Sequence, residues 1–174
     1  MLFRPASLTE FFGESEKTKP LCDAIGEMAA WTRDLLGEER LAWLRELPLK
    51  QTHGAVALVH ASPDSLWRAP MPEASDEELK KVYSGLTRPI AVYAHIHRSY
   101  VRASPELTVV NTGSVSLSHD GDRRSAYLLL DDSIATIRRV EYDVDREADA
   151  LSNCGLPHAE WVVRMLRSGR PQGL

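Results

Sequence analysis

The chain has 174 residues, of which 43% are hydrophobic and 26% are charged, values that are ordinary for a soluble globular protein. Its length suits a single domain, residues 1–174, with a sizeable core. The formal net charge of −4 shows no basic surplus, so the composition does not support nucleic-acid binding. No apolar run approaches the roughly 20 residues that cross a bilayer, and the N-terminus lacks a signal-peptide core. We therefore expect no membrane partner and a cytoplasmic location.

The first part of the chain predicts helices. A capping-box spacing at residues 7–10 predicts a short helix within a poorly defined lead-in of residues 1–20. Apolar residues at helical spacing then predict one helix over residues 21–36 and a second over about 38–47. Gly37 and Pro48 are natural ends for these two helices.

From residue 49 onward the apolar residues follow the pattern of strands. We predict strands at residues 49–52, 55–60, 89–94, 100–102, 107–110, 125–131 and 134–142. A capped helix at residues 75–86 interrupts them, and helices at 143–155 and from 157 onward close the chain. The runs 55–60 and 89–94 are nearly all apolar, as expected for strands covered on both faces. This order indicates an α/β layered domain with a mixed sheet.

Three histidines stand at the ends of predicted strands. His60 closes the run 55–60, and His95 and His97 follow the run 89–94. Neutral imidazoles gathered at strand ends suit a transition-metal site. In a strand or extended turn, the spacing of His95 and His97 directs both side chains to one side. A single histidine is more often structural, but a His-x-His pair after an apolar strand favours metal binding.

Two other polar segments have simpler interpretations. Residues 111–114 contain a glycine that would let backbone N–H groups approach a ligand. A tight turn in which Asn111 bonds its own backbone is the favoured interpretation. Residues 120–124 combine carboxylates and guanidinium groups, and a solvated hairpin turn is favoured there over a phosphate or metal site. The remaining histidines, His53, His119 and His158, are expected at the surface.

The chain resembles the calcineurin-like metallophosphoesterases, in their small bacterial phosphodiesterase branch. His60-Ala61-Ser62-Pro63 is similar to the family's His-Gly-Ser-Pro motif, and Ala94-His95-Ile96-His97 is similar to its Gly-His-Thr-His motif. Residues 110–115 and 120–127 match the segments that usually follow. The resemblance covers roughly residues 21–170, and several motifs in the right order make it specific.

The resemblance implies a partial four-layer αββα sandwich with mixed β-sheets. It also implies divalent transition-metal ions (Mn, Fe, Zn or Ni), two in the full family site and one or none here. His60 and His95 would bind one ion and His97 the other. A metal-activated hydroxide would then attack a phosphate ester of a small molecule. Asn111 and Arg98 are the expected substrate-binding residues.

The departures from the family pattern are large. The Asp-x-His, Gly-Asp and Gly-Asn-His-Asp motifs are absent, and in the family they precede the position of Met1. We therefore expect the C-terminal portion of the domain, with little or no activity alone. An exposed sheet edge would be covered by a missing N-terminal half or by self-association. Ala61 and Ala94 replace glycines, and these changes matter if either position requires a positive φ.

Two alternatives stay open at this point. One is a non-catalytic binding or oligomerisation module on the same scaffold, and the other is a mononuclear hydrolase whose single ion is bound by all three histidines. The catalytic residues are unknown, because the family's proton-donating histidine belongs to an absent motif.

Overall fold

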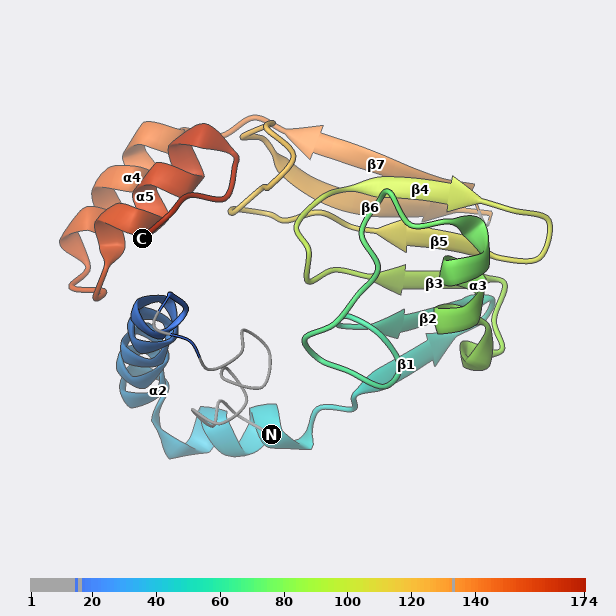
Figure 1. Ribbon diagram of the computed structural model, residues 1–174, viewed down its shortest axis with the longest axis horizontal. Coiled ribbons are helices and arrows are strands. Elements are labelled where there is room, and N and C mark those ends of the chain that lie inside the picture. The colour runs from blue at the N-terminus through green and yellow to red at the C-terminus, as the bar shows by residue number, and fades with distance from the viewer. Residues whose placement is uncertain (1–14, 16, 133) are drawn as a thin grey trace. The chain divides into compact units, whose positions relative to one another are not determined.

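The computed structural model describes residues 15, 17–132 and 134–174 (Figure 1). The short helix predicted after residues 7–10 lies outside the described residues. The described chain divides into two compact units. One contains the residues up to Leu47 together with 144–164 and 172–174, and the other contains 48–143 and 165–171.

The first unit is helical. It contains α2 (Lys19–Glu46), α4 (Val144–Asn153) and the part of α5 (Ala159–Ser168) up to residue 164. The two helices predicted before residue 48 form the single element α2, which is kinked at Gly37. Gly37 has a φ of 73° and a ψ of 164°, a conformation that only glycine adopts without strain. Gly37 therefore ends the first helical segment and separates it from the second, as predicted.

The second unit is built on a mixed five-stranded sheet. Its strands are β1 (Lys50–His53), β2 (Val56–Val59), β3 (Ile90–Tyr93), β4 (Tyr100–Ala103) and β5 (Thr108–Asn111), in the order β1-β2-β3-β5-β4. The three central strands β2, β3 and β5 are parallel, and the edge strands β1 and β4 are antiparallel to their neighbours (Figure 1). Two further strands, β6 (Ser125–Asp131) and β7 (Ile134–Val140), form a separate hairpin sheet.

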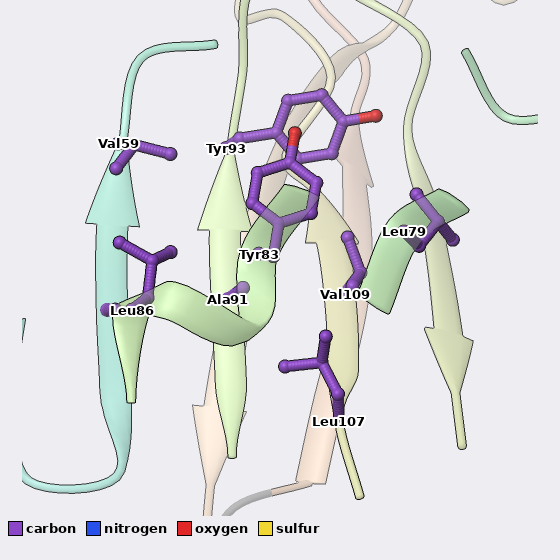
Figure 2. Close-up of a cluster of buried hydrophobic side chains, with 9 residues drawn as sticks. Val59, Leu79, Tyr83, Leu86, Ala91, Tyr93, Leu107 and Val109 are labelled. Carbon is purple, nitrogen blue, oxygen red and sulfur yellow. The ribbon is translucent and has the colours of Figure 1, made fainter. Parts of the chain in front are cut away.

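Layers pack against both faces of the five-stranded sheet, and β3 is buried at every position, as its apolar run predicted, whereas Leu58 of β2 stays 39% exposed. One face packs against α3 (Asp76–Tyr83) and the 3-10 turn η1 (Ser84–Leu86). Figure 2 shows the buried side chains of this layer, which are Ala57, Val59, Leu79, Tyr83, Leu86, Ala91, Tyr93, Leu107 and Val109. The opposite face packs against the hairpin through Ile90, Val92, Val110, Leu128, Leu130 and Ile137. The unit therefore has three layers, one of helix and two of sheet.

Successive residues of the central strands serve these two layers in turn. In β3, Ala91 and Tyr93 face the helical layer, whereas Ile90 and Val92 face the hairpin. This alternation follows from the two-residue period of a strand. It explains why β3 has no polar residue and is buried at every position.

An open apolar hollow lies between the sheet and the hairpin. It has a volume of about 560 Å³, and its lining includes Leu58, Val92, Val115, Leu128 and Leu130. Leu58 is 39% exposed and Val115 is 68% exposed, so apolar surface at this place faces the solvent. Within the described residues, no helix has the length and apolar character needed to cross a membrane.

Candidate metal centre

The parallel strands bring two of the predicted ligands together. His60 directly follows β2, and His95 lies two residues beyond the end of β3. Since β2 and β3 are parallel neighbours, their carboxyl ends meet at one edge of the sheet. The Ala94 N–H donates to the His60 carbonyl at 3.0 Å. Nε2 of His60 lies 3.0 Å from Nδ1 of His95, and the ring centroids are 4.9 Å apart.

The backbone carbonyl of Trp67 sets the tautomer of His95. Nε2 of His95 lies 2.8 Å from this oxygen, which can only accept a hydrogen bond, so Nε2 carries the proton. Nδ1 of a neutral His95 therefore has a lone pair directed at His60. Desolvation lowers the pKa of both rings, assisted by His97 at His60 and by His60 at His95. A neutral imidazole with one N–H held by a carbonyl is the usual state of a metal-binding histidine.

His97 lies on a neighbouring part of the site. Its Nδ1 lies 2.7 Å from the carbonyl oxygen of Leu117, so Nδ1 carries the proton and Nε2 has the lone pair. Its ring packs against that of His119, with centroids 4.9 Å apart and planes at 39°. His119 is half-buried, so it is less exposed than the sequence suggested. His53 and His158 are exposed, as predicted.

The backbone around these histidines is strained. His95 has a φ of 50° and His97 a φ of 55°, in the left-handed region that residues other than glycine seldom adopt. The extended turn assumed from their spacing is therefore wrong. Each such residue costs of order 1–3 kcal/mol and persists only where the surroundings require it. Ala61 and Ala94 are not among the residues with positive φ, so their extra methyl groups do not strain the chain.

The donor set fits an ion only in part. Among the described residues, no group of three or more His, Cys, Asp or Glu side chains is arranged to hold a metal ion. The His60–His95 pair nevertheless has suitable spacing. Two nitrogens bound to one ion at about 2.1 Å and at right angles are about 3.0 Å apart. His60 would then carry its proton on Nδ1, so binding requires a change of tautomer.

The two expected substrate-binding residues have protein partners. Asn111 is fully buried, and its side-chain amide donates to the Ala94 carbonyl while its oxygen accepts from the Gly113 N–H at 2.9 Å. Asn111 thus supports the turn before His95, and its bond to Gly113 is the backbone turn that the sequence favoured. Arg98 forms an ion pair with Glu73, with a shortest distance of 2.6 Å. Substrate contact by either residue stays a prediction.

A charged network beside His119 was missed from the sequence. Asp120 is not part of a solvated turn, since its side chain is only 20% exposed and pairs with Arg139 of β7 at 2.5 Å. The hydroxyls of Ser99 and Ser118 also donate to Asp120, at 3.1 and 2.7 Å. Burial opposes ionisation of Asp120, but the hydrogen bonds from Arg139 and Ser118 outweigh it and hold its pKa well below the usual range. The network joins three separate segments of the chain.

Comparison with known proteins identifies the fold. No family model matches this sequence, and no curated protein shows significant similarity to it. A metallophosphoesterase from Sphaerobacter thermophilus aligns with a TM-score of 0.68 and 23% identity, covering 81% of this chain and 65% of that protein. A hypothetical protein from Pyrococcus horikoshii OT3 aligns with a TM-score of 0.73 and 18% identity, covering 97% of this chain and 66% of that protein.

The chain therefore has the calcineurin-like metallophosphoesterase fold, as its motifs predicted. It spans 65% and 66% of the lengths of these two proteins, so it corresponds to less than two thirds of either.

Proposed function

We propose that this chain carries part of a metal-dependent phosphoesterase site. In this proposal His60 and His95 bind one divalent transition-metal ion (Mn, Fe, Zn or Ni), and His97 faces a second. The observation that carries the proposal is the 3.0 Å approach of the two imidazole nitrogens at the carboxyl ends of adjacent parallel strands. The fold shared with a metallophosphoesterase supports the same function.

The surrounding residues would hold the ligands in place. The Trp67 carbonyl keeps the His95 proton on Nε2, so Nδ1 is the nitrogen available to an ion. The buried Tyr83 hydroxyl donates to the Ala61 carbonyl at 2.7 Å, which fixes the chain directly after His60. When bound, an ion at this site supplies Lewis acidity toward phosphoryl oxygens and lowers the pKa of water.

The proposed substrate is a phosphate ester of a small molecule. Arg98 lies directly after His97, and its guanidinium could exchange the Glu73 carboxylate for a phosphate group, which has similar bidentate geometry. Asn111 would act by holding the Ala94 turn. A cytoplasmic location is part of the proposal and is supported by the two free cysteines, Cys22 and Cys154.

Phosphate binding tests the proposal without requiring turnover. The isolated chain is titrated with inorganic phosphate in a calorimeter, with and without Mn²⁺. We expect phosphate to bind only to the metal-loaded chain and to lose this binding in His95→Ala. The matched control is His53→Ala, because His53 is exposed on β1. Phosphate binding that is independent of metal, or that survives in His95→Ala, would refute the proposal.

Hydrolysis is a separate expectation for the chain alone. No three possible metal-binding side chains are grouped within the described residues. The metal-loaded chain should therefore hydrolyse a nitrophenyl phosphodiester slowly or not at all. Rapid turnover that is lost in His95→Ala would contradict this expectation of low activity, although it would leave the phosphoesterase proposal standing.

A further inference from the structure

Strand β6 is apolar without interruption from residue 126 to residue 130. Its sequence there is Ala-Tyr-Leu-Leu-Leu, a run typical of an inner strand that is covered on both faces. Within the described part of the chain, however, β6 pairs with β7 alone, so its other side is a sheet edge. Tyr127 and Leu129, which point away from the five-stranded sheet, are 45% and 43% exposed. The sequence of β6 therefore suits a position inside a wider sheet.

The backbone along this edge offers hydrogen-bonding groups on the side away from β7. The Ala126 N–H donates to the Ser114 carbonyl at 2.9 Å, and Ser114 lies outside the hairpin. Because successive residues of a strand direct their N–H and C=O groups to opposite sides, those of Leu128 and Leu130 point the same way as those of Ala126. An edge of this kind is a template for another strand. Ser114 occupies its first position, and the positions beyond it suit an added strand.

The other strands at sheet edges carry charged side chains. Lys50 lies in β1, Arg102 in β4 and Arg138 in β7. Charges on an edge strand oppose its pairing with a further strand. In β6 the first charged residue is Asp131, which is the last residue of the strand. Among the described strands, β6 is therefore the edge best suited to pairing.

The open hollow beside β6 offers a surface for the side chains of an added strand. The hairpin packs over β3 and β5, and β7 contacts β4, so Leu58 of β2 stays 39% exposed (Figure 1). Leu58 and its neighbour in register, Val92, line the hollow together with Leu128 and Leu130. Among the described residues, its lining contains no charged side chain. An occupant should therefore be an extended segment whose uncharged apolar side chains face the hollow.

A second copy of this chain does not fit the hollow. Antiparallel pairing of two β6 strands would place the two hairpins side by side, so that both five-stranded sheets share the layer below. Neighbouring strands lie about 4.8 Å apart, and stacked sheets lie about 10 Å apart. In each copy, β2 and β1 extend the larger sheet beyond β6, so these strands would occupy the same space. The hollow suits an extended segment that has no second five-stranded sheet beneath it.

We propose that β6 receives an added strand and that this strand comes from the part of the fold outside this chain. The alignments cover 65% and 66% of the two similar proteins, so about a third of each lies outside the aligned part. The added strand would place apolar side chains at alternate positions on Leu58 and Val92. It would also widen the hairpin to three strands, the number from which a sheet with an apolar face gains stability of its own. The inference needs no metal ion and stands apart from the proposed function.

Titration with a synthetic strand tests the inference. The probe is the acetylated and amidated peptide Thr-Val-Thr-Val-Thr-Val-Thr, which is uncharged and has one apolar face. Its binding to the ¹⁵N-labelled chain is followed by NMR and by amide hydrogen exchange. We expect saturable binding in which the Leu128 and Leu130 N–H groups exchange at least about tenfold more slowly, because they gain hydrogen-bond partners. A peptide with proline in place of the central valine should bind at least about tenfold more weakly, since proline lacks the N–H.

Two variants of the chain separate the hollow from the rest of the hairpin. Leu58→Lys places a charge in the hollow and should weaken binding of the peptide at least about tenfold. The matched control is Val140→Lys, because Val140 is 50% exposed on β7, and this variant should bind the peptide as the wild type does. If Leu58→Lys does not fold, hydrogen exchange of the wild type with and without the peptide decides.

Several outcomes would overturn the inference. These are a peptide that does not bind, binding that survives in Leu58→Lys, and binding that leaves hydrogen exchange at Leu128 and Leu130 unchanged. Analytical ultracentrifugation of the chain alone tests the second copy as occupant. A dimer in which both N–H groups are protected would overturn the inference, and so would their protection in the monomer without peptide. None of these results would affect the proposed metal site, which is tested by phosphate and Mn²⁺ binding.

Discussion

Replacement of Arg139 by alanine tests whether a charge pair holds the loop that carries His119. The Arg139 guanidinium lies 2.5 Å from the Asp120 carboxylate and 2.5 Å from the Ser99 hydroxyl. The side chains of Arg139 and Asp120 are 18% and 20% exposed, so the pair is largely removed from water. Breaking a fully buried pair costs about 3–5 kcal/mol. Because Asp120 keeps its bonds from Ser118 and from the Asp122 N–H, we expect a smaller loss of about 2–3 kcal/mol.

The loss should depend on pH. The folded-state pKa of Asp120 is lower than its unfolded value of about 3.9. Its ionised form therefore stabilises the fold above about pH 4, and this contribution is lost as the pH falls through the folded-state pKa. Removing Arg139 brings the Asp120 pKa closer to the unfolded value. The difference between wild type and Arg139→Ala should be largest near neutral pH and smaller at pH 3.

Urea unfolding followed by circular dichroism at pH 7 and pH 3 measures both effects. The matched control is Arg138→Ala, because Arg138 is the exposed neighbour of Arg139 on β7. This control should change the free energy of unfolding by less than about 0.5 kcal/mol. If Arg139→Ala is as stable as the control, or if its loss is the same at both pH values, the reasoning about this network is wrong.

Three further predictions concern the backbone, the core and the apolar hollow. His97→Gly should be more stable than His97→Ala by about 1 kcal/mol in urea, because the φ of 55° favours glycine; equal stabilities would contradict the left-handed conformation. Tyr83→Phe should lose about 1–2 kcal/mol of unfolding free energy, since it leaves the Ala61 carbonyl without its buried donor; an unchanged midpoint would show that this bond contributes nothing. The native protein should bind the dye anilinonaphthalene sulfonate in the hollow, and Leu58→Lys should weaken the fluorescence while Leu35→Lys on α2 should not. A native protein that leaves the dye dark would contradict an accessible apolar hollow.

The strands and helices were predictable because local patterns determine them. The apolar run that contains β3 predicts a strand buried on both faces, and its residues do alternate between two cores. The Ser75–Glu78 spacing predicts the start of α3, where the Ser75 side chain accepts from the Glu78 N–H at 3.2 Å. The apolar runs 55–60 and 89–94 likewise predict that His60 and His95 stand at strand ends. Parallel pairing then places the two rings at one edge of the sheet.

The remaining features of the site depend on contacts between distant segments. The sequence around His119 resembles a polar turn, and its packing on His97 arises only once the loop is tied to the His97 segment. The left-handed conformations of His95 and His97 are imposed by the surrounding fold and have no local signal. The network of Asp120 and Arg139 has one signal in the sequence. This signal is an acidic turn followed by an arginine on a later strand.

The most direct test of the account is the position of bound metal in a crystal. Crystals of the chain are soaked in Mn²⁺, and anomalous diffraction locates the ions. We expect a peak bonded to both Nε2 of His60 and Nδ1 of His95, the two atoms that are now 3.0 Å apart. A map without a peak there at saturating Mn²⁺, with the two rings still hydrogen-bonded to each other, would contradict the proposal that this pair binds a metal ion.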